Sequence, residues 1–389
     1  MKVLVCQHGA RHRYAVPIIL HRLGMLEALY TDTTAYSTLG RLARTIKKFG
    51  INNSKINKVA SRTINEIPVS KIYTKDIWSE IFPFPRFRNV DSLAQVYLNW
   101  GTKNADCIYS MNAVDIQFLE YAHQKGLKIV IDAFTNPLTD KILSEECEKF
   151  GFDNKIYLQQ FEWWKKRYDI AASIATIILC PSEWVADAWI NLYPDIVDKI
   201  RICPYGSSLP KVHKINPSPD KVIMFAGRAP MIKGLYYLAQ AAKFVHVKYP
   251  DWKIVVAGLT EKQVPWIDNG HLIYLGNLPL DEIHSWYKRS YAFILPSLTE
   301  GQASVILEAM SSGCPVIATR ESGVTIPSNV GITIPSRNVD AIIDTITSLI
   351  QNFDQRQSFA QMSLQYVDNF SLESWSNRLN SIFSTLKND

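Results

Sequence analysis

The sequence of 389 residues contains no long apolar run. Its longest apolar stretch, ASIATIILC at residues 172–180, is far shorter than the roughly 18 residues that a membrane-spanning helix needs. Near the N-terminus only VLVC precedes polar and basic residues, which is too short for the core of a signal peptide and is typical of a buried first strand. We therefore expect a protein that is neither exported by a signal peptide nor embedded in a membrane, and that works in the cytoplasm.

Cysteine pairs and closely spaced aspartates are also missing. The six cysteines form no Cys-x-x-Cys pair and most lie in apolar surroundings, so buried thiols in a reducing cytosol are expected rather than a zinc site. No two aspartates are spaced as Asp-x-Asp, which argues against metal-dependent phosphate chemistry of that type. The sequence therefore predicts no metal site.

Basic charge is concentrated in the first part of the chain. The net charge is +6, but residues 1–103 alone hold 16 Lys and Arg against 6 Asp and Glu. Much of the excess lies in 41–88, where Trp78, Phe82, Phe84 and Phe87 are interleaved with the charges. This pattern suits an anionic surface such as a bilayer interface, and it equally fits a solvated helical face with a few core aromatics. Nucleic acid is not expected as a partner, because no DNA- or RNA-binding motif accompanies the charge.

Short apolar runs alternate with amphipathic stretches along the chain. A hydrophobic content of 47% and a charged content of 20% are typical of a globular protein. Strands are expected at 2–8, 105–110, 128–134 and 175–182, and again at 221–227, 252–258, 271–276, 291–297, 314–319 and 331–335. Strands that alternate with helices predict parallel βαβ units.

The expected fold is therefore α/β, with two Rossmann-like domains that face each other across a central cleft. The Pro-, Ser- and Lys-rich stretch at 201–221 predicts the boundary between them. We assign 1–205 to an N-terminal domain, 206–368 to a C-terminal domain, and 369–389 to a final helix that packs back on the N-terminal domain.

The segment MFAGRAPMIKGLYYLAQAAKFV (224–245) predicts a strand, a glycine turn and a helix. Such a turn lets backbone N–H groups and the helix dipole face an anion, and Arg228 and Lys233 add positive charge at the same place. These residues could hold a diphosphate without a metal ion. An ordinary turn with two solvated basic residues explains the spacing as well, because the segment is neither a complete GxGxxG nor a Walker loop.

Two glutamates bracket the start of another expected helix, at 302–312. Glu300 precedes the helix, so its carboxylate and the free N–H groups of Gly301, Gln302 and Ala303 are expected to face the same space. Acceptor and donors side by side suit a polyhydroxylated ligand. Glu308 lies on a polar stripe of the helix with Ser304, Ser311 and Ser312, and a solvent-facing position explains it equally well.

The two segments together resemble the retaining glycosyltransferases of family four, which have the GT-B fold. The resemblance rests on AGR and KG at 226–234 and on PSLTEGQASVILEAMSSGCPVIAT at 296–319, in which Glu300 and Glu308 match the family's E-x7-E motif. It extends to PSEW (181–184), CPYG (203–206), VAG (256–258) and LGNLP (275–279). The C-terminal domain is covered well and the N-terminal domain in outline.

By position, the resemblance implies that Arg228 and Lys233 clamp the diphosphate of a nucleotide-sugar, that Glu308 holds the ribose and that Glu300 holds the donor sugar. Catalytic roles thus fall to Arg228, Lys233 and Glu300. Donor contacts are expected from Gly9, Gly227, Gly258, Asn277, Gly301, Gln302, Ala303 and Glu308. Acceptor contacts are expected from Arg11, His12, Asp132 and Asn136. No metal and no cofactor are implied beyond the donor itself.

The implied activity is transfer of a hexose-type sugar, with retention, from a UDP- or GDP-linked donor to a glycan or lipid-linked acceptor. Such a protein serves surface polysaccharide or glycoconjugate synthesis, at the inner face of the cell membrane if region 41–88 binds lipid. The alternatives are a nucleotide-sugar epimerase or sugar-phosphate synthase of the same fold, and a non-catalytic binding subunit. The sequence departs from the family pattern at Gln302-Ala303, where Phe-Gly is common, and at Asp132, Thr135 and Asn136, near which many members carry a histidine.

Overall fold

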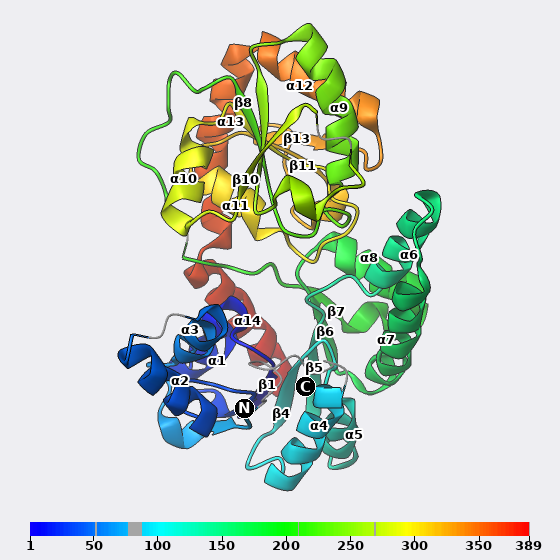
Figure 1. Cartoon of the computed structure of the whole chain (residues 1–389). Helices are drawn as coiled ribbons and strands as arrows, with labels where there is room; N and C mark the ends of the chain where they lie inside the picture. Colours follow the sequence, from blue (N-terminus) through cyan, green and yellow to red (C-terminus); the bar gives the residue numbers. More distant parts are fainter. Residues whose placement is uncertain (51–52, 77–87, 209, 268–269, 389) are drawn as a thin grey trace.

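Two separate parallel sheets organise the chain, and Figure 1 shows them as the centres of two lobes. A computed structural model describes residues 1–50, 53–76, 88–208, 210–267 and 270–388. The first sheet has the order β3-β2-β1-β4-β5-β6-β7 and the second β10-β9-β8-β11-β12-β13. Every pairing within them is parallel. This is the predicted arrangement of two Rossmann-like α/β domains.

The strands are short and mostly buried on both faces. In the first sheet they are β1 (Val3–Gln7), β2 (Leu26–Thr31), β3 (Ile72–Thr74), β4 (Cys107–Met111), β5 (Lys128–Asp132), β6 (Ile177–Cys180) and β7 (Ile200–Ile202). In the second they are β8 (Val222–Ala226), β9 (Lys253–Ala257), β10 (Leu272–Gly276), β11 (Ala292–Leu295), β12 (Val316–Thr319) and β13 (Gly331–Ile334). Helices on both faces explain why the central strands read as continuous apolar runs.

Helices lie between most successive strands. In the N-terminal domain they are α1 (Ala15–Arg22), α2 (Thr38–Lys48), α3 (Ser54–Ala60), α4 (Arg88–Trp100), α5 (Ile116–Gln124), α6 (Thr139–Lys149), α7 (Lys155–Ile174) and α8 (Glu183–Leu192). In the C-terminal part they are α9 (Leu235–Lys248), α10 (Leu280–Arg289), α11 (Ser304–Ser311), α12 (Val339–Gln351), α13 (Phe353–Tyr366) and α14 (Leu372–Asn388). Among the described residues no helix is both long and apolar enough to span a bilayer.

The last helix crosses back to the first domain. α14 runs from the upper lobe into the lower one in Figure 1, where its buried residues Trp375, Leu379 and Phe383 join a core with β1 and α1. The Ser371 hydroxyl accepts a hydrogen bond from the Ser374 amide (3.1 Å) and so caps the start of the helix. Beside this crossing, the Ser207 amide donates a hydrogen bond to the Phe370 carbonyl (2.9 Å). This bond joins the segment that leaves the N-terminal domain to the segment that returns to it. The predicted boundary at 205/206 lies in this stretch, between β7 and β8.

The two domains also meet away from these crossings. Glu146 on α6 accepts a hydrogen bond from the Tyr237 hydroxyl on α9 (2.9 Å) and forms an ion pair with Arg337. The Glu146 side chain is 2% exposed and the Arg337 side chain 34%, so the carboxylate is buried where the domains meet and the guanidinium reaches the surface. The cleft is therefore closed at α6.

Candidate functional site

Glycines line the carboxyl edge of the second sheet. Gly227, Gly258 and Gly276 stand at the ends of β8, β9 and β10, and the Gly258 amide donates to the Gly276 carbonyl over 2.7 Å. Gly258 has φ +93°, and a Cβ there would lie 2.8 Å from the Gly227 carbonyl oxygen. Only glycine fits such backbone contacts. At this edge, where ligands of parallel sheets bind, main chain therefore packs closely on main chain.

Lys233 and Glu300 come together at this edge. The Lys233 ammonium is 2.5 Å from Glu300 Oε1, although 67 residues separate them, and the side chains are 13% and 18% exposed. Lys233 lies across Gly227, where a Cβ would be 2.0 Å from its Cδ. At Gly234, with φ +66°, a Cβ would lie 2.0 Å from the Pro296 carbonyl oxygen, so glycine lets the same turn pass close to that carbonyl. The predicted diphosphate lysine and the predicted sugar carboxylate thus share one place.

The loop after Glu300 is pressed against the N-terminal domain. A Cβ on Gly301 would lie 1.9 Å from the Phe134 carbonyl oxygen, and the Gly301 carbonyl accepts a hydrogen bond from the Ser182 hydroxyl (2.8 Å). The Gln302 side chain pairs with the backbone of Tyr205, accepting from its N–H (2.8 Å) and donating to its carbonyl (3.1 Å). Both glycine and glutamine therefore hold the domains together at the site.

Of the three amides predicted to face a sugar, one is already used. The Ala303 N–H donates to the Ser322 carbonyl over 2.9 Å, and Ala303 is buried. This part of the prediction is wrong, because a committed N–H cannot also serve a ligand. The amides of Gly301 and Gln302 have no acceptor among the described residues and remain next to Glu300.

Glu308 lies on α11 and is not a solvent-facing residue. Burial raises the pKa of its carboxyl above the ordinary value, against the opposing effects of His284 and the Tyr287 hydroxyl, which lies 3.4 Å from Oε2. Ser311 and Ser312, predicted on the same polar stripe, are also buried, because α10 and α13 cover this side of the helix. Glu308 opens instead onto a cavity of about 300 Å³ between the domains.

Arg228 and Asn277 project from the same sheet edge into solvent. Both side chains are exposed. Arg228 forms no ion pair within the part of the chain that the structure describes, which leaves its guanidinium open to an anion. These positions agree with a role at the rim of the site.

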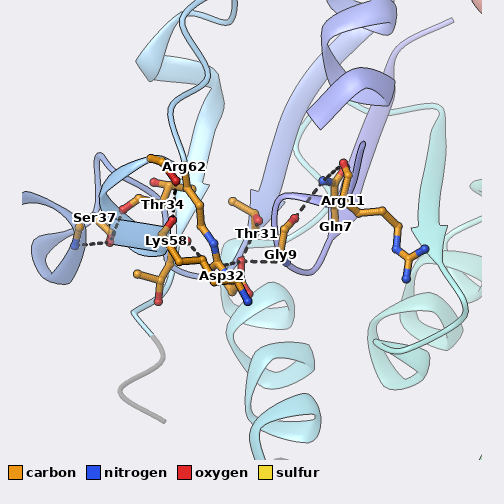
Figure 2. A network of polar contacts seen from close by, with 12 residues as sticks. Gln7, Gly9, Arg11, Thr31, Asp32, Thr34, Ser37, Lys58 and Arg62 are labelled. Carbon is orange, nitrogen blue, oxygen red and sulfur yellow. Dashed lines mark hydrogen bonds and ion pairs between the residues drawn. The ribbon is translucent and has the colours of Figure 1, made fainter. Parts of the chain in front are cut away.

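The N-terminal domain has a glycine turn of its own, which follows β1. Figure 2 shows the Gly9 amide held by Asp32 Oδ1 (3.0 Å), and Gln7 Nε2 donating to the Gly9 and Arg11 carbonyls (2.9 and 3.2 Å). The Arg11 guanidinium stacks 3.4 Å above the Phe134 ring. His12 lines the same cavity as Glu308.

Asp132 and Asn136, predicted on the acceptor side, are buried instead. Asp132 is 1% exposed and accepts hydrogen bonds from the hydroxyls of Tyr109 and Tyr205, both over 2.5 Å. Asn136 is also 1% exposed, and its Oδ1 accepts from the Leu138 amide (2.8 Å) at the start of α6. Both side chains thus organise the cleft wall and do not face an acceptor. The burial of Asp132 could not be predicted, because the sequence does not show that Tyr109 and Tyr205 donate hydrogen bonds to it.

The remaining predictions concern charge and metals. All six cysteines are buried. No group of three or more His, Cys, Asp or Glu side chains that could hold a metal ion occurs in the described ranges. Within region 41–88, Trp78, Phe82, Phe84 and Phe87 lie outside the described residues.

Comparison with known proteins agrees with this geometry. Residues 220–352 match the family model described as glycosyl transferases group 1. The match runs from just before β8 to just after α12, within the C-terminal domain. Two bacterial relatives are a D-inositol 3-phosphate glycosyltransferase of Corynebacterium urealyticum, 28% identical over 44% of each chain, and the capsular polysaccharide biosynthesis glycosyltransferase CapM of Staphylococcus aureus, 26% identical over 56% of this chain and 63% of CapM. The chain thus spans about half the length of the relatives it matches.

Solved structures share the whole glycosyltransferase fold. A sucrose-phosphate synthase from Thermosynechococcus elongatus superposes with a TM-score of 0.69 over 99% of both chains, at 14% identity. Anabaena HepE in complex with UDP has a TM-score of 0.65 over 99% of this chain and 100% of its own, at 14% identity. The fold is therefore GT-B, with two Rossmann-like domains.

Proposed function

We propose that the protein is a retaining glycosyltransferase that moves a hexose-type sugar from a UDP- or GDP-linked donor to a glycan or lipid-linked acceptor. The observation that carries the proposal is the Lys233–Glu300 pair (2.5 Å) at a sheet edge lined by glycines. It places one positive and one negative side chain together at the carboxyl edge of the second sheet. A sugar diphosphate needs both, since its phosphates attract a cation and its hydroxyls need acceptors.

In the proposed reaction Lys233 and Glu300, which form an ion pair with each other, exchange that contact for contacts with the donor. The diphosphate attracts Lys233, with Arg228 adding charge from the rim, and Glu300 is released to accept from hydroxyls of the sugar. The amides of Gly301 and Gln302 donate to the sugar from the same side. Glu308 accepts hydrogen bonds from the ribose hydroxyls.

The chemical step breaks the bond between the sugar C1 and the diphosphate oxygen. The acceptor hydroxyl attacks C1 from the same face, its oxygen forms the new bond, and its proton passes to the leaving phosphate. Negative charge grows on the diphosphate as the bond breaks, and preorganised cations at that position lower the barrier. The role of this chain's residues is thus to hold the charge that develops.

The proposal for the acceptor rests on one relative, and the proposal for membrane attachment rests on the exposed side chains of α2. A capsular polysaccharide glycosyltransferase among the relatives supports a surface glycan or its lipid-linked precursor. On α2, Arg41, Arg44, Lys47 and Lys48 are exposed, together with Leu42 (50%) and Phe49 (79%). Basic and apolar side chains on one exposed helix suit the anionic surface of a bilayer. We therefore propose peripheral attachment at the inner face of the cell membrane.

The activity is tested with purified protein and a set of UDP- and GDP-hexoses, by following release of the nucleoside diphosphate with lipid-linked and soluble glycan acceptors. Transfer that depends on an acceptor and retains the anomeric configuration is the expected result. Conversion of a donor without any acceptor would indicate an epimerase instead. Binding without turnover under every condition would indicate a non-catalytic subunit.

A further inference from the structure

The loop that carries Glu300 is fixed to the N-terminal domain by the Gln302 side chain. Glu300 belongs to the ion pair with Lys233, and Gln302 follows it by two residues. The Gln302 amide oxygen accepts a hydrogen bond from the Tyr205 N–H (2.8 Å), and its nitrogen donates one to the Tyr205 carbonyl (3.1 Å). Because only Gly301 lies between Glu300 and Gln302, this double contact constrains where the carboxylate can lie.

The double contact depends on the chemistry of a side-chain amide. An amide carries an acceptor and a donor on one planar group, so it can satisfy the N–H and the carbonyl of a single residue together. The phenylalanine that is common at position 302 in the family this sequence resembles could make neither bond. The departure from the family pattern at Gln302 therefore adds a contact between the domains.

Tyr205 is a firm point to which the loop can be tied. It is 7% exposed, and its ring packs against His12 and Trp375, with centroids 4.4 and 5.4 Å apart. The residue before it is held as well, because the Pro204 carbonyl accepts a hydrogen bond from the Arg378 guanidinium on α14 (2.8 Å). Residues of the N-terminal domain and of α14 therefore fix the backbone that Gln302 contacts.

Asp132 holds the hydroxyl of Tyr205. Its Oδ1 accepts a hydrogen bond from the Tyr205 hydroxyl and its Oδ2 one from the Tyr109 hydroxyl, each over 2.5 Å, and Asp132 is 1% exposed. A buried carboxyl group is costly without such donors, so the carboxyl and the two hydroxyls form one unit. Asp132 is another position at which the sequence departs from the family pattern. The departures at Asp132 and Gln302 thus meet on Tyr205, one at its hydroxyl and the other at its backbone.

We propose that the Gln302 side chain is a positioning group: its contact with the Tyr205 backbone fixes the Glu300 carboxylate against the donor sugar. Asp132 steadies Tyr205 for this contact. The inference rests on the proposed function, in which Glu300 and the amides of Gly301 and Gln302 hold the sugar. A loop that is already tied down loses less conformational freedom when the sugar binds. The side chains of Gln302, Tyr205 and Asp132 act on the reaction through this loop and not by contact with the reacting atoms.

Calorimetry tests the inference with two ligands: the UDP- or GDP-hexose that the wild type binds most tightly, and the matching UDP or GDP. The dissociation constant of the hexose donor divided by that of the nucleoside diphosphate isolates the contribution of the sugar. Gln302→Met keeps the backbone amide but makes neither bond to Tyr205. It should raise this ratio about two- to tenfold, the size of one hydrogen bond to the sugar, and leave the constant for UDP or GDP unchanged.

The controls separate positioning from folding. Glu300→Ala, which removes the carboxylate itself, should raise the ratio at least as much as Gln302→Met does. Gln361→Met, at an exposed glutamine on α13, is the matched substitution and should change neither constant. A loss of stability alone would lower the number of binding sites and leave the ratio as it is.

Tyr205→Phe tests the support from Asp132. It removes only the hydroxyl and keeps the ring and the backbone that Gln302 contacts. The ratio should rise by a smaller factor than in Gln302→Met. The double variant should match Gln302→Met alone, because the hydroxyl acts on the loop through Gln302.

Each other outcome has a distinct meaning. If Gln302→Met keeps the wild-type ratio while Glu300→Ala raises it, Gln302 does not position Glu300, and the inference is overturned while the donor site stands. A Tyr205→Phe variant without effect, or effects that add in the double variant, would overturn the part given to Asp132 and Tyr205. If Glu300→Ala also keeps the wild-type ratio, or no UDP- or GDP-hexose binds to the wild type, the proposed function itself fails.

Discussion

At the scale of single residues, function depends on charges that have been placed close together. Lys233 is paired with Glu300, and Arg228, in the turn that leads to Lys233, is exposed. Lys233→Ala and Arg228→Ala should each lower kcat by about 10²–10³, the usual effect of removing one preorganised group that stabilises transition-state charge. Steady-state kinetics measures the effect, with Lys248→Ala, an exposed lysine on α9, as the control. Near-normal turnover in both variants would contradict the diphosphate clamp.

Glu308 is a residue whose proposed function costs folding stability. Because burial raises the pKa of its carboxyl, ionisation costs folding stability at pH values above that pKa, and the penalty disappears when the carboxyl is protonated at low pH. Glu308→Gln should therefore melt higher than the wild type at pH 8, by about 2–4 °C for a penalty near 1 kcal/mol. The difference should shrink as the pH falls toward 5. A melting temperature that is unchanged or lower at pH 8 would argue against a penalised carboxylate.

At the scale of elements, the turn between β8 and α9 contains two glycines, and we expect substitution of one to lower activity and substitution of the other to lower stability. A methyl group at Gly227 would meet only the flexible Lys233 side chain (2.0 Å to Cδ), so Gly227→Ala should fold and displace the ammonium. At Gly234 it would meet the Pro296 carbonyl (2.0 Å) in a left-handed backbone, which cannot yield as easily. Gly227→Ala should thus lose turnover with little change in denaturant midpoint, whereas Gly234→Ala should lose stability. The reverse pattern would contradict the packing at this turn.

The final helix is a second element with a checkable role. Trp375 on α14 is 1% exposed and contacts Tyr205 and His12, with ring centroids 5.4 and 5.5 Å apart. Trp375→Ala should cost about 3–5 kcal/mol, as large aromatic deletions in cores do. Urea unfolding followed by tryptophan fluorescence should show the loss in the N-terminal domain, where α14 packs. An unchanged midpoint there would mean that α14 contributes little to that core.

The sequence predicted these elements unevenly. Buried strands such as β8 and β12 were evident because helices on both faces make them continuous apolar runs. β2 (LEALYT) and the short edge strands β3 and β7 were missed, since charged residues or a length of three residues remove that signal. Gly227 and Lys233 were found from their turn, but the ion pair with Glu300 was not, because only the folded sheet brings β8 and β11 side by side. The pairing of Gln302 with Tyr205 gave no signal either, since nothing in the sequence connects two residues that are 97 positions apart.

At the scale of the whole molecule, the two domains are joined by a contact of α6. Glu146 on α6 reaches Arg337 of the other domain, and removing Arg337 leaves a carboxylate that is 2% exposed with the Tyr237 hydroxyl as its one side-chain partner among the described residues. Arg337→Ala should weaken closure by about 1–3 kcal/mol, the penalty of a buried polar group that loses a partner. Small-angle scattering should show a larger radius of gyration, and KM for the donor should rise. Arg337→Lys, which keeps the charge, should stay closer to the wild type, and identical scattering for all three proteins would refute the role of this contact.

Binding to membranes also belongs to the whole molecule. If α2 contacts anionic lipid, the protein should co-sediment with vesicles that contain phosphatidylserine at low salt and be released as salt screens the charges. Replacing Lys47 and Lys48 together by Glu should abolish sedimentation, while turnover of a soluble acceptor stays unchanged. Sedimentation at background level with the wild type would exclude this surface.

The central claim is that the glycine-lined edge and the neighbouring cavity form a nucleotide-sugar site. Thermal melting of the protein against UDP, GDP, ADP and CMP, without added metal, tests it most directly, because a ligand that binds the folded state raises the melting temperature. We predict a rise with UDP or GDP that disappears in Glu308→Ala. No rise with any of the nucleotides, or a rise that Glu308→Ala leaves unchanged, would contradict the account.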